Sequence, residues 1–179
     1  MRSIRLCAVA AAFVLAGCGN GGAADPGAAS AAQAFVEYRP AGGEYAISVP
    51  PGWARAEAGA SVTFTDQRDT ITVDLGTASA APNVSGGEDE LEALRGKTRG
   101  FADPTVSVIE RPAGQVLLVT YRADAPPDAA GGQVVNDDVE RYEYWRAPSA
   151  LLTVTLAAPH GSDNVDTWRT VTESVRWLA

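Results

Sequence analysis

A single histidine lies near a serine and an aspartate close to the C-terminal end of the sequence. His160, Ser162 and Asp163 are the residue types of a nucleophile–base–acid triad, which performs acyl transfer. Residues this close along a chain cannot form that geometry unaided, and the chain has no Gly-x-Ser-x-Gly motif. We therefore interpret His160 as an exposed residue before the last helix. One histidine also excludes a metal site built on several histidines.

A run of acidic and amide side chains offers oxygen ligands. Asn136, Asp137 and Asp138 could gather around a calcium ion with Asp128 and Glu140. Their spacing does not match the alternating ligands and the glycine of an EF-hand loop. The alternative is a solvated acidic loop, which would attract a cationic partner. We predict no resident metal and no cofactor.

Aromatic side chains follow directly on this acidic run. Tyr142 and Tyr144 share one face of a strand, whereas Trp145 takes the other, and together with Trp53 they are dense enough to line a pocket. The alternative is that most of them belong to the core. The candidate binding residues are therefore Asp128, Asp137, Asp138, Glu140, Tyr142 and Tyr144.

The triplet Gly96-Lys97-Thr98 has the residues that end a phosphate-binding loop. The full motif needs a glycine at position 91, where this chain has Leu91, and the loop must precede a helix. Here the triplet ends a predicted helix. Lys97 is better explained as a cation that complements the C-terminal end of that helix.

The first residues of the chain indicate an export signal. Arg2 and Arg5 form a positive segment, and the apolar stretch of about 12 residues that follows spans roughly 18 Å as a helix, too short for a bilayer core of about 30 Å. The tetrapeptide Leu15-Ala16-Gly17-Cys18 resembles the lipobox of bacterial lipoproteins. We expect cleavage of residues 1–17 and acylation of Cys18. The alternative is an ordinary secretory signal with a chance cysteine.

Charge and cysteine content restrict what the exported chain can do. The net charge is −8, and cleavage would remove two arginines, so the balance argues against nucleic acid and against adhesion to anionic lipid. Cleavage would also remove Cys7, which leaves no partner for a disulfide with Cys18. Residues 18–43 are dominated by Gly and Ala and predict a flexible tether, with a short first strand at Phe35–Tyr38 as the alternative.

Residues 44–179 contain the patterns of one folded domain. Period-two alternation predicts antiparallel strands with one buried face. These strands are expected over residues 45–49, from 53 onward, and over 61–66, 70–75, 105–111, 115–122, 139–146 and 151–157. A long loop over residues 123–138, rich in Gly, Pro and Asp, interrupts them.

Two helices are expected within this domain. A capping box from Ser85 to Glu88 begins the first, and Gly100 caps its end. Asp163 is expected to cap the second helix, whose apolar stripe should lie on the sheet. This stripe consists of Val165, Trp168, Val171, Val175 and Leu178. The order ββββ-α-ββββ-α predicts an α+β fold with a mainly antiparallel sheet.

Several segments resemble PsbP/Mog-type domains. "YAISVPPGW" (45–53) is similar to the opening of such domains, "VTFTD" and "ITVDLG" to the next hairpin, and "TWRTVTESVRW" (167–177) to the closing helix. The resemblance implies a curved antiparallel sheet flanked by helices, and family members are mostly non-catalytic. No ligand motif of the family maps onto this chain, so the fold is implied and a site is not. Together with the lipobox and the composition, it suggests an actinobacterial envelope lipoprotein.

These observations lead to one functional expectation. We expect a non-enzymatic lipoprotein on the extracytoplasmic face of the membrane, binding an envelope protein or a small ligand through the loop over 123–138 and the face with Tyr142 and Tyr144. The alternative is an envelope hydrolase, which would need two carboxylates within about 5 to 10 Å in one cleft.

Overall fold

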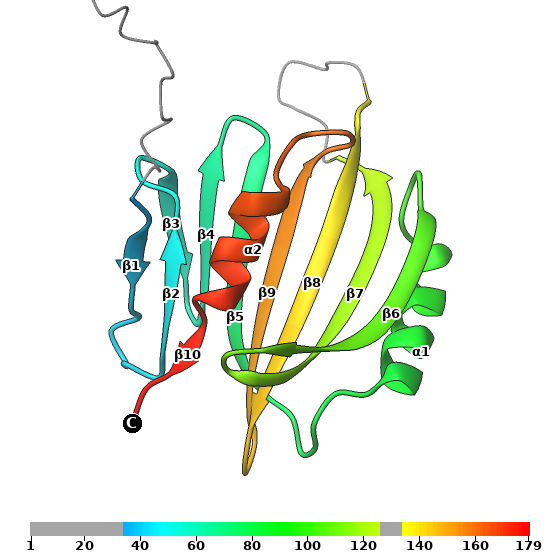
Figure 1. Cartoon of the computed structure of the whole chain (residues 1–179). Coiled ribbons are helices and arrows are strands. Elements are labelled where there is room, and N and C mark those ends of the chain that lie inside the picture. The colour runs from blue at the N-terminus through cyan, green and yellow to red at the C-terminus, as the bar shows by residue number, and fades with distance from the viewer. Residues whose placement is uncertain (1–33, 126–133) are drawn as a thin grey trace, which may run out of the picture. The chain divides into compact units, whose positions relative to one another are not determined.

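A computed structural model describes residues 34–125 and 134–179, so the signal peptide, Cys18 and Asp128 lie outside the described residues. The elements follow the order β1–β5, α1, β6–β9, α2, β10 (Figure 1). The strands are β1 (Val36–Tyr38), β2 (Tyr45–Val49), β3 (Ala54–Ala58), β4 (Ser61–Asp66), β5 (Asp69–Thr77), β6 (Ala102–Arg111), β7 (Gly114–Asp124), β8 (Asn136–Arg146), β9 (Ala150–Pro159) and β10 (Arg176–Trp177), and the helices are α1 (Val84–Arg95) and α2 (Val165–Glu173).

Seven strands form one antiparallel sheet in the order β3-β4-β5-β9-β8-β7-β6. The alternation of the sequence produces it, because successive side chains of a strand point to opposite faces. On β5, for example, Ile71 and Val73 are fully buried, while Thr70 and Thr72 on the other face are half-buried. The predicted strands and the α+β class are confirmed.

The predicted loop over residues 123–138 is shorter than expected. Ala123 of β7 pairs with Asp137 of β8, and Asp124 pairs with Asn136. Asp137 and Asp138 are therefore strand residues and not part of a solvated loop. Because they are adjacent on one strand, their side chains point to opposite faces of the sheet.

A smaller sheet, β1-β2-β10, and α2 cover one face of the large sheet, which we call the inner face. Tyr45 and Ile47 of β2, Val171 of α2 and the inward side chains of the large sheet form one apolar core. Residues 36–38 form β1, which pairs with β2. The sequence allowed either a tether or a short strand here, and the structure has the strand.

The helix α1 packs on the opposite, outer face against β6 and β7. Its Leu91 forms a separate apolar cluster with Leu117 and Val119 of β7. The approach is close at Gly87, where a Cβ atom would lie 2.8 Å from Cγ1 of Val106. A residue without a side chain is therefore needed where α1 meets β6.

The ends of the first helix differ from those predicted. The N-cap of α1 is Asn83, whose side chain accepts a hydrogen bond from the backbone N–H of Gly86 at 3.0 Å. The capping box at Ser85 was wrong, because the helix begins before it. The helix ends at Gly96 rather than Gly100.

The second helix also differs at both ends. Its N-cap is Asn164, without a side-chain capping bond, so the cap predicted at Asp163 was wrong. It ends at Ser174, whose hydroxyl accepts from the backbone N–H of Ser48 and donates to the carbonyl of Val171. The next residues form β10 against β2. Leu178 therefore lies beyond the helix, and Val165 is 71% exposed rather than packed on the sheet.

Candidate functional site

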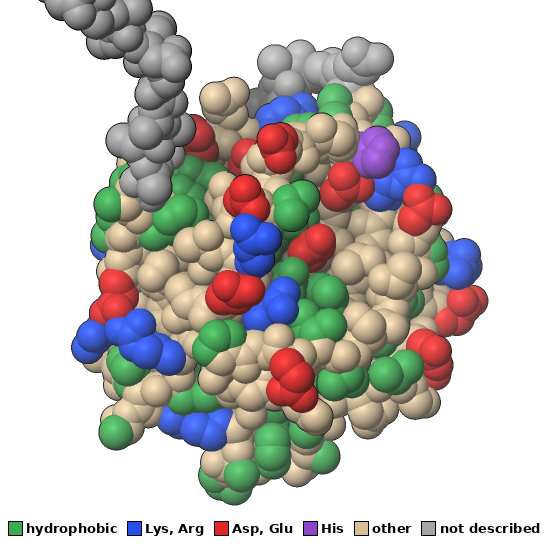
Figure 2. Space-filling model, viewed as in Figure 1, with side chains coloured by type: hydrophobic (Ala, Val, Ile, Leu, Met, Phe, Trp, Pro, Cys, Tyr) green, Lys and Arg blue, Asp and Glu red, His purple; other side chains and the backbone are tan. Residues whose placement is uncertain are grey.

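An open groove of about 530 Å³ lies between α2 and the inner face of β6, β7 and β8, and we call it the α2 groove. The strands β6 and β7 curl forward at one side of the sheet (Figure 1), and their residues Asp103, Arg111 and Arg122 line the far wall of the groove. On this face, acidic and basic side chains gather over and beside α2, with the histidine at one end (Figure 2). Charged and aromatic lining residues are Asp103, Arg111, Tyr121, Arg122, Asp138, Glu140, Tyr142, His160, Trp168 and Arg169.

The floor of the groove comes largely from alternate residues of β8. Asp138, Glu140 and Tyr142 point to the inner face because they are two residues apart on one strand. Tyr144 continues this row into the core. It is 1% exposed, and its hydroxyl donates to the carbonyl of Thr172 on α2 at 2.7 Å. Tyr142 therefore lines the groove, whereas Tyr144 holds α2 against the sheet.

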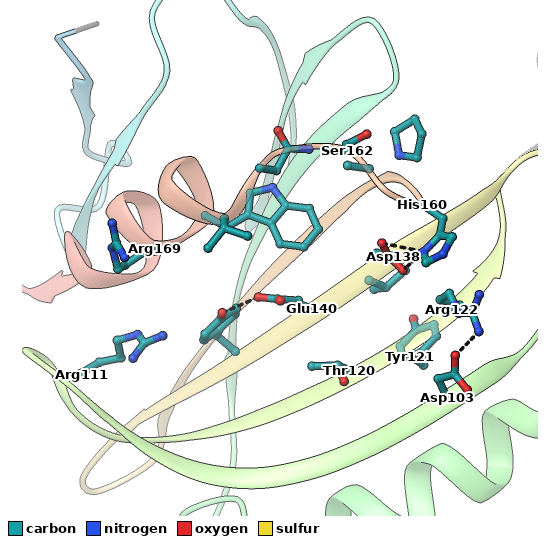
Figure 3. A pocket seen from close by; sticks show the side chains of 17 residues that line it. Asp103, Arg111, Thr120, Tyr121, Arg122, Asp138, Glu140, His160, Ser162 and Arg169 are labelled. Carbon is teal, nitrogen blue, oxygen red and sulfur yellow. Dashed lines mark hydrogen bonds and ion pairs between the residues drawn. The ribbon is translucent and has the colours of Figure 1, made fainter. Parts of the chain in front are cut away.

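At one end of the groove, His160 is paired with Asp138. The Nδ1 atom of His160 lies 2.8 Å and 3.0 Å from the two carboxylate oxygens of Asp138 (Figure 3). The backbone N–H of Gly161 donates to Oδ2 of the same carboxylate at 3.3 Å. The pairing of β8 with β9 places Asp138 opposite Ala158, which brings the loop after β9 beside it. The acidic partner of the histidine is thus Asp138 and not the neighbouring Asp163.

In the middle of the groove, a tyrosine, a glutamate and an arginine lie together. The Tyr142 hydroxyl donates to Glu140, and the guanidinium of Arg111 lies 5.6 Å from the Tyr142 ring centroid. Figure 3 labels Arg111 and Glu140 on this side of the groove. Burial raises the pKa of Tyr142, so this hydroxyl stays protonated and remains a donor. Arg111 also donates to Thr172 Oγ1 at 3.4 Å. Among the described residues, no carboxylate lies within ion-pair distance of Arg111.

An ion pair lies on the far wall, where Arg122 of β7 contacts Asp103 of β6. The register of β6 shifts between Ala102 and Thr105, and Asp103 has φ +47°. An aspartate adopts this left-handed conformation more readily than most residues. The bulge re-aims the Asp103 side chain toward Arg122, as bulges do at strand edges.

The structure brings together only part of the predicted set. Asp138, Glu140 and Tyr142 line the α2 groove. Asp137 points to the outer side of β8, Tyr144 is in the core, and Asp128 lies outside the described residues. Sequence reasoning missed the arginines of the groove, because they come from β6, β7 and α2, whose neighbours in space depend on strand register.

Asp137 is a buried carboxylate, 7% exposed, with the Arg68 guanidinium 4.0 Å away. Burial, with the charges of Asp69 and Asp138, raises its pKa above the ordinary 3.8. A raised pKa favours folding of the protonated form, so its ionised form weakens the fold at neutral pH. We expect Asp137→Asn to raise the midpoint of urea unfolding at neutral pH. This gain should disappear as the pH falls below 3.8.

The matched control for this prediction is Asp74→Asn, at an exposed position of β5. Removing a charge there should leave the unfolding midpoint nearly unchanged. If Asp137→Asn lowers the midpoint at neutral pH, the carboxylate stabilises the fold through Arg68 and the prediction is wrong.

No group of three or more His, Cys, Asp and Glu side chains in residues 34–125 and 134–179 is arranged to hold a metal ion. In the same residues, no helix is both long and apolar enough to cross a bilayer.

No family model and no curated protein matches the sequence, but solved structures do match the fold. The cyanobacterial PsbP protein of Synechocystis is 15% identical with a TM-score of 0.57, covering 88% of this chain and 100% of its own. The Ran-binding protein Mog1p of Saccharomyces cerevisiae is 11% identical with a TM-score of 0.53, covering 80% and 95%.

Two bacterial structures also match. LpqN of Mycobacterium tuberculosis, involved in cell envelope biogenesis, is 11% identical with a TM-score of 0.51, covering 82% of this chain and 91% of its own. A Bacteroides thetaiotaomicron structure is 12% identical with a TM-score of 0.55 over 82% of this chain, which spans about half (49%) of that protein. The chain therefore has a PsbP/Mog-like fold, as the sequence resemblance predicted.

Proposed function

We propose that the chain is a lipid-anchored protein of a bacterial cell envelope, in the actinobacterial setting that its composition suggests, and that it binds a ligand in the α2 groove without transforming it. The lipobox ending at Cys18 supports the anchor. The similarity of fold to LpqN, a protein involved in cell envelope biogenesis, supports the location.

The observation that carries the binding proposal is that each carboxylate described in the groove already has a hydrogen-bond or ion-pair partner. Asp138 is paired with His160, Asp103 with Arg122, and Glu140 accepts from Tyr142. In the described residues, the other two arginines that line the groove, Arg122 and Arg169, each form an ion pair with a carboxylate, whereas Arg111 forms none. The Arg111 guanidinium lies against the ring of Tyr142.

The groove therefore suits a ligand with an anionic group beside an apolar part. The anionic group would meet Arg111, because a guanidinium forms strong charge-assisted hydrogen bonds with anions. The apolar part would lie against Trp168 and the exposed Val165. A volume of about 530 Å³ is within the usual range for small-molecule sites, and it also admits side chains of a protein partner. The Ran-binding function in the name of Mog1p supports a protein partner as the alternative ligand.

The test is a titration with the fluorescent probe anilinonaphthalene sulfonate, which carries a sulfonate on an aromatic body. We expect saturable binding to the folded protein, and about tenfold weaker binding by Arg111→Ala, since one charge-assisted hydrogen bond is worth about 1.4 kcal/mol or more. The control is Arg95→Ala, because Arg95 is exposed on α1 at the outer face. Equal weakening in both variants, or no saturable binding, would contradict the proposal.

A hydrolase is the second candidate, since Asp138 and Glu140 face the same groove and Asp138 is hydrogen-bonded to a histidine. All three groove carboxylates already accept a hydrogen bond or an ion pair, which favours binding over acid catalysis. The purified protein should therefore not hydrolyse chromogenic esters or glycosides. Turnover that Asp138→Asn abolishes would replace the binding proposal.

A further inference from the structure

Within the residues that the structure describes, strand β3 is an uncovered edge of the seven-stranded sheet. In these residues it pairs with β4 alone, and all five of its own residues are exposed. The opposite edge, β6, contains a bulge and Pro104, two devices that prevent pairing with another chain. Ala54–Ala58 contains neither a proline nor a bulge. The edge at β3 is therefore open to a further strand.

The hairpin between β3 and β4 determines which backbone groups face this edge. The two-residue turn has Gly59 at φ +64°, and Ala58 pairs with Ser61 across it. The pair that closes a two-residue turn exchanges hydrogen bonds, and hydrogen-bonded pairs then alternate along the strand. The N–H and C=O groups of Ala54, Ala56 and Ala58 thus point to β4. Those of Arg55 and Glu57 point to the free edge.

The sequence of β3, Ala-Arg-Ala-Glu-Ala, is complementary to itself in the antiparallel direction. Suppose that a second copy pairs so that its Ala56 lies opposite Ala56 of the first copy. Arg55 of each copy then lies opposite Glu57 of the other copy. We propose that β3 is a self-association edge, where two copies of the chain pair about a two-fold axis at Ala56 and join their large sheets. In this register, the outward backbone groups of Arg55 and Glu57 all find partners.

The side chains of both residues are held in place for this pairing. Arg55 and Glu57 lie on the same face of β3, where the Tyr38 hydroxyl donates to Glu57 at 3.3 Å and the Arg55 guanidinium lies 5.7 Å from the Tyr38 ring centroid. Within one copy, Arg55 and Glu57 are 3.5 Å apart and more than half exposed. In the pair of copies, each charge has opposite charges as neighbours along its own strand and across the interface.

The size of the edge determines how strong the association is. A strand of five residues buries less surface than stable soluble dimers need. The pairing is therefore weak in dilute solution. It becomes significant where copies are concentrated beside one another, as a shared membrane anchor would achieve.

Disulfide trapping tests the register. The full chain with Cys7→Ala and Cys18→Ala also carries Ala56→Cys, and is concentrated and oxidised with copper phenanthroline. Residues opposite each other in a non-hydrogen-bonded pair have Cα atoms about 4.5 Å apart, within the range for a disulfide. The matched control is Ala54→Cys, on the same face of the same exposed strand, which would lie opposite Ala58 of the second copy. We expect Ala56→Cys to form the covalent dimer at least tenfold faster, and equal rates would overturn the proposal.

Charge reversal tests the complementarity independently. In the Ala56→Cys background, Arg55→Glu places like charges opposite each other and should slow trapping severalfold. Adding Glu57→Arg to the Arg55→Glu variant places opposite charges across the interface again and should restore the rate of disulfide trapping. Failure of the double reversal to recover would contradict the pairing. Because neither residue lines the α2 groove, probe binding is expected to stay unchanged in all these variants, so this inference and the proposed function can fail separately.

Discussion

Replacing Cys18 by serine is expected to move the protein from the membrane fraction to the soluble fraction. The residues Leu15-Ala16-Gly17-Cys18 predict acylation of that cysteine. One acyl chain gives only reversible membrane binding, with an association constant of about 10⁴ M⁻¹, whereas two chains anchor a protein stably. The variant cannot be acylated, so its partition into membranes should fall by about 10⁴-fold or more. Fractionation followed by immunoblotting measures this change.

The other cysteine provides the matched control. Cys7→Ser changes the apolar signal segment, which is expected to be removed, so this variant should stay in the membrane fraction. Mass spectrometry of the native protein should find an acylated Cys18 at the N-terminus. Retention of Cys18→Ser in the membrane would point to a different anchor, and an unmodified, freely shed protein would refute the lipoprotein assignment.

Strands were predictable from this sequence because the central strands of the sheet, such as β5 and β9, have a buried and a less buried face. The pattern Ile71, Thr72, Val73 shows this directly, and the structure confirms its alternating burial. Helix ends were not predictable, because they depend on tertiary contacts. The end of α2 is determined by Ser174, which bonds to Ser48 on a strand 126 residues away in sequence.

The same distinction explains what was predictable of the candidate site. Glu140 and Tyr142 could be placed together because positions two apart on a strand share a face. The assignment of Asp137 to a loop was wrong, because β8 begins at Asn136 and no local pattern indicates that start. The pair of Asp138 with His160 depends on the register of β8 against β9, which no local pattern records.

The largest expected effect on stability lies on the outer face of β8. Arg141 contacts Glu90 of α1 through both terminal nitrogens, and its Nη2 lies 3.0 Å from Glu143 Oε1. The side chains of Arg141 and Glu143 are only 13% and 14% exposed. Burial raises the pKa of Glu143, and the positive charge of Arg141 offsets part of this rise. The arginine therefore compensates a buried carboxylate and also ties α1 to the sheet.

We expect Arg141→Met to lower the free energy of unfolding by about 3 kcal/mol at neutral pH, because removing one partner of a buried pair leaves the other charge uncompensated. The control is Arg95→Met, which breaks an exposed pair with Glu92 on α1 and should cost less than about 1 kcal/mol. Urea unfolding measures both. If both variants lose the same free energy of unfolding, the buried ion pair of Arg141 contributes no more to stability than the exposed pair of Arg95, and the prediction is wrong.

The pH dependence separates the uncompensated charge from a simple packing defect. Without Arg141, the pKa of Glu143 in the folded state rises further above its ordinary 4.5. A carboxyl with a raised pKa favours the folded state when it is protonated, and this advantage is lost as the pH rises through the folded pKa. The deficit of Arg141→Met should therefore shrink as the pH falls toward 4.5 and below. Adding Glu143→Gln to Arg141→Met should restore stability at neutral pH, because it removes the buried charge. A packing defect would instead cost the same free energy at every pH, and it would persist in the double variant.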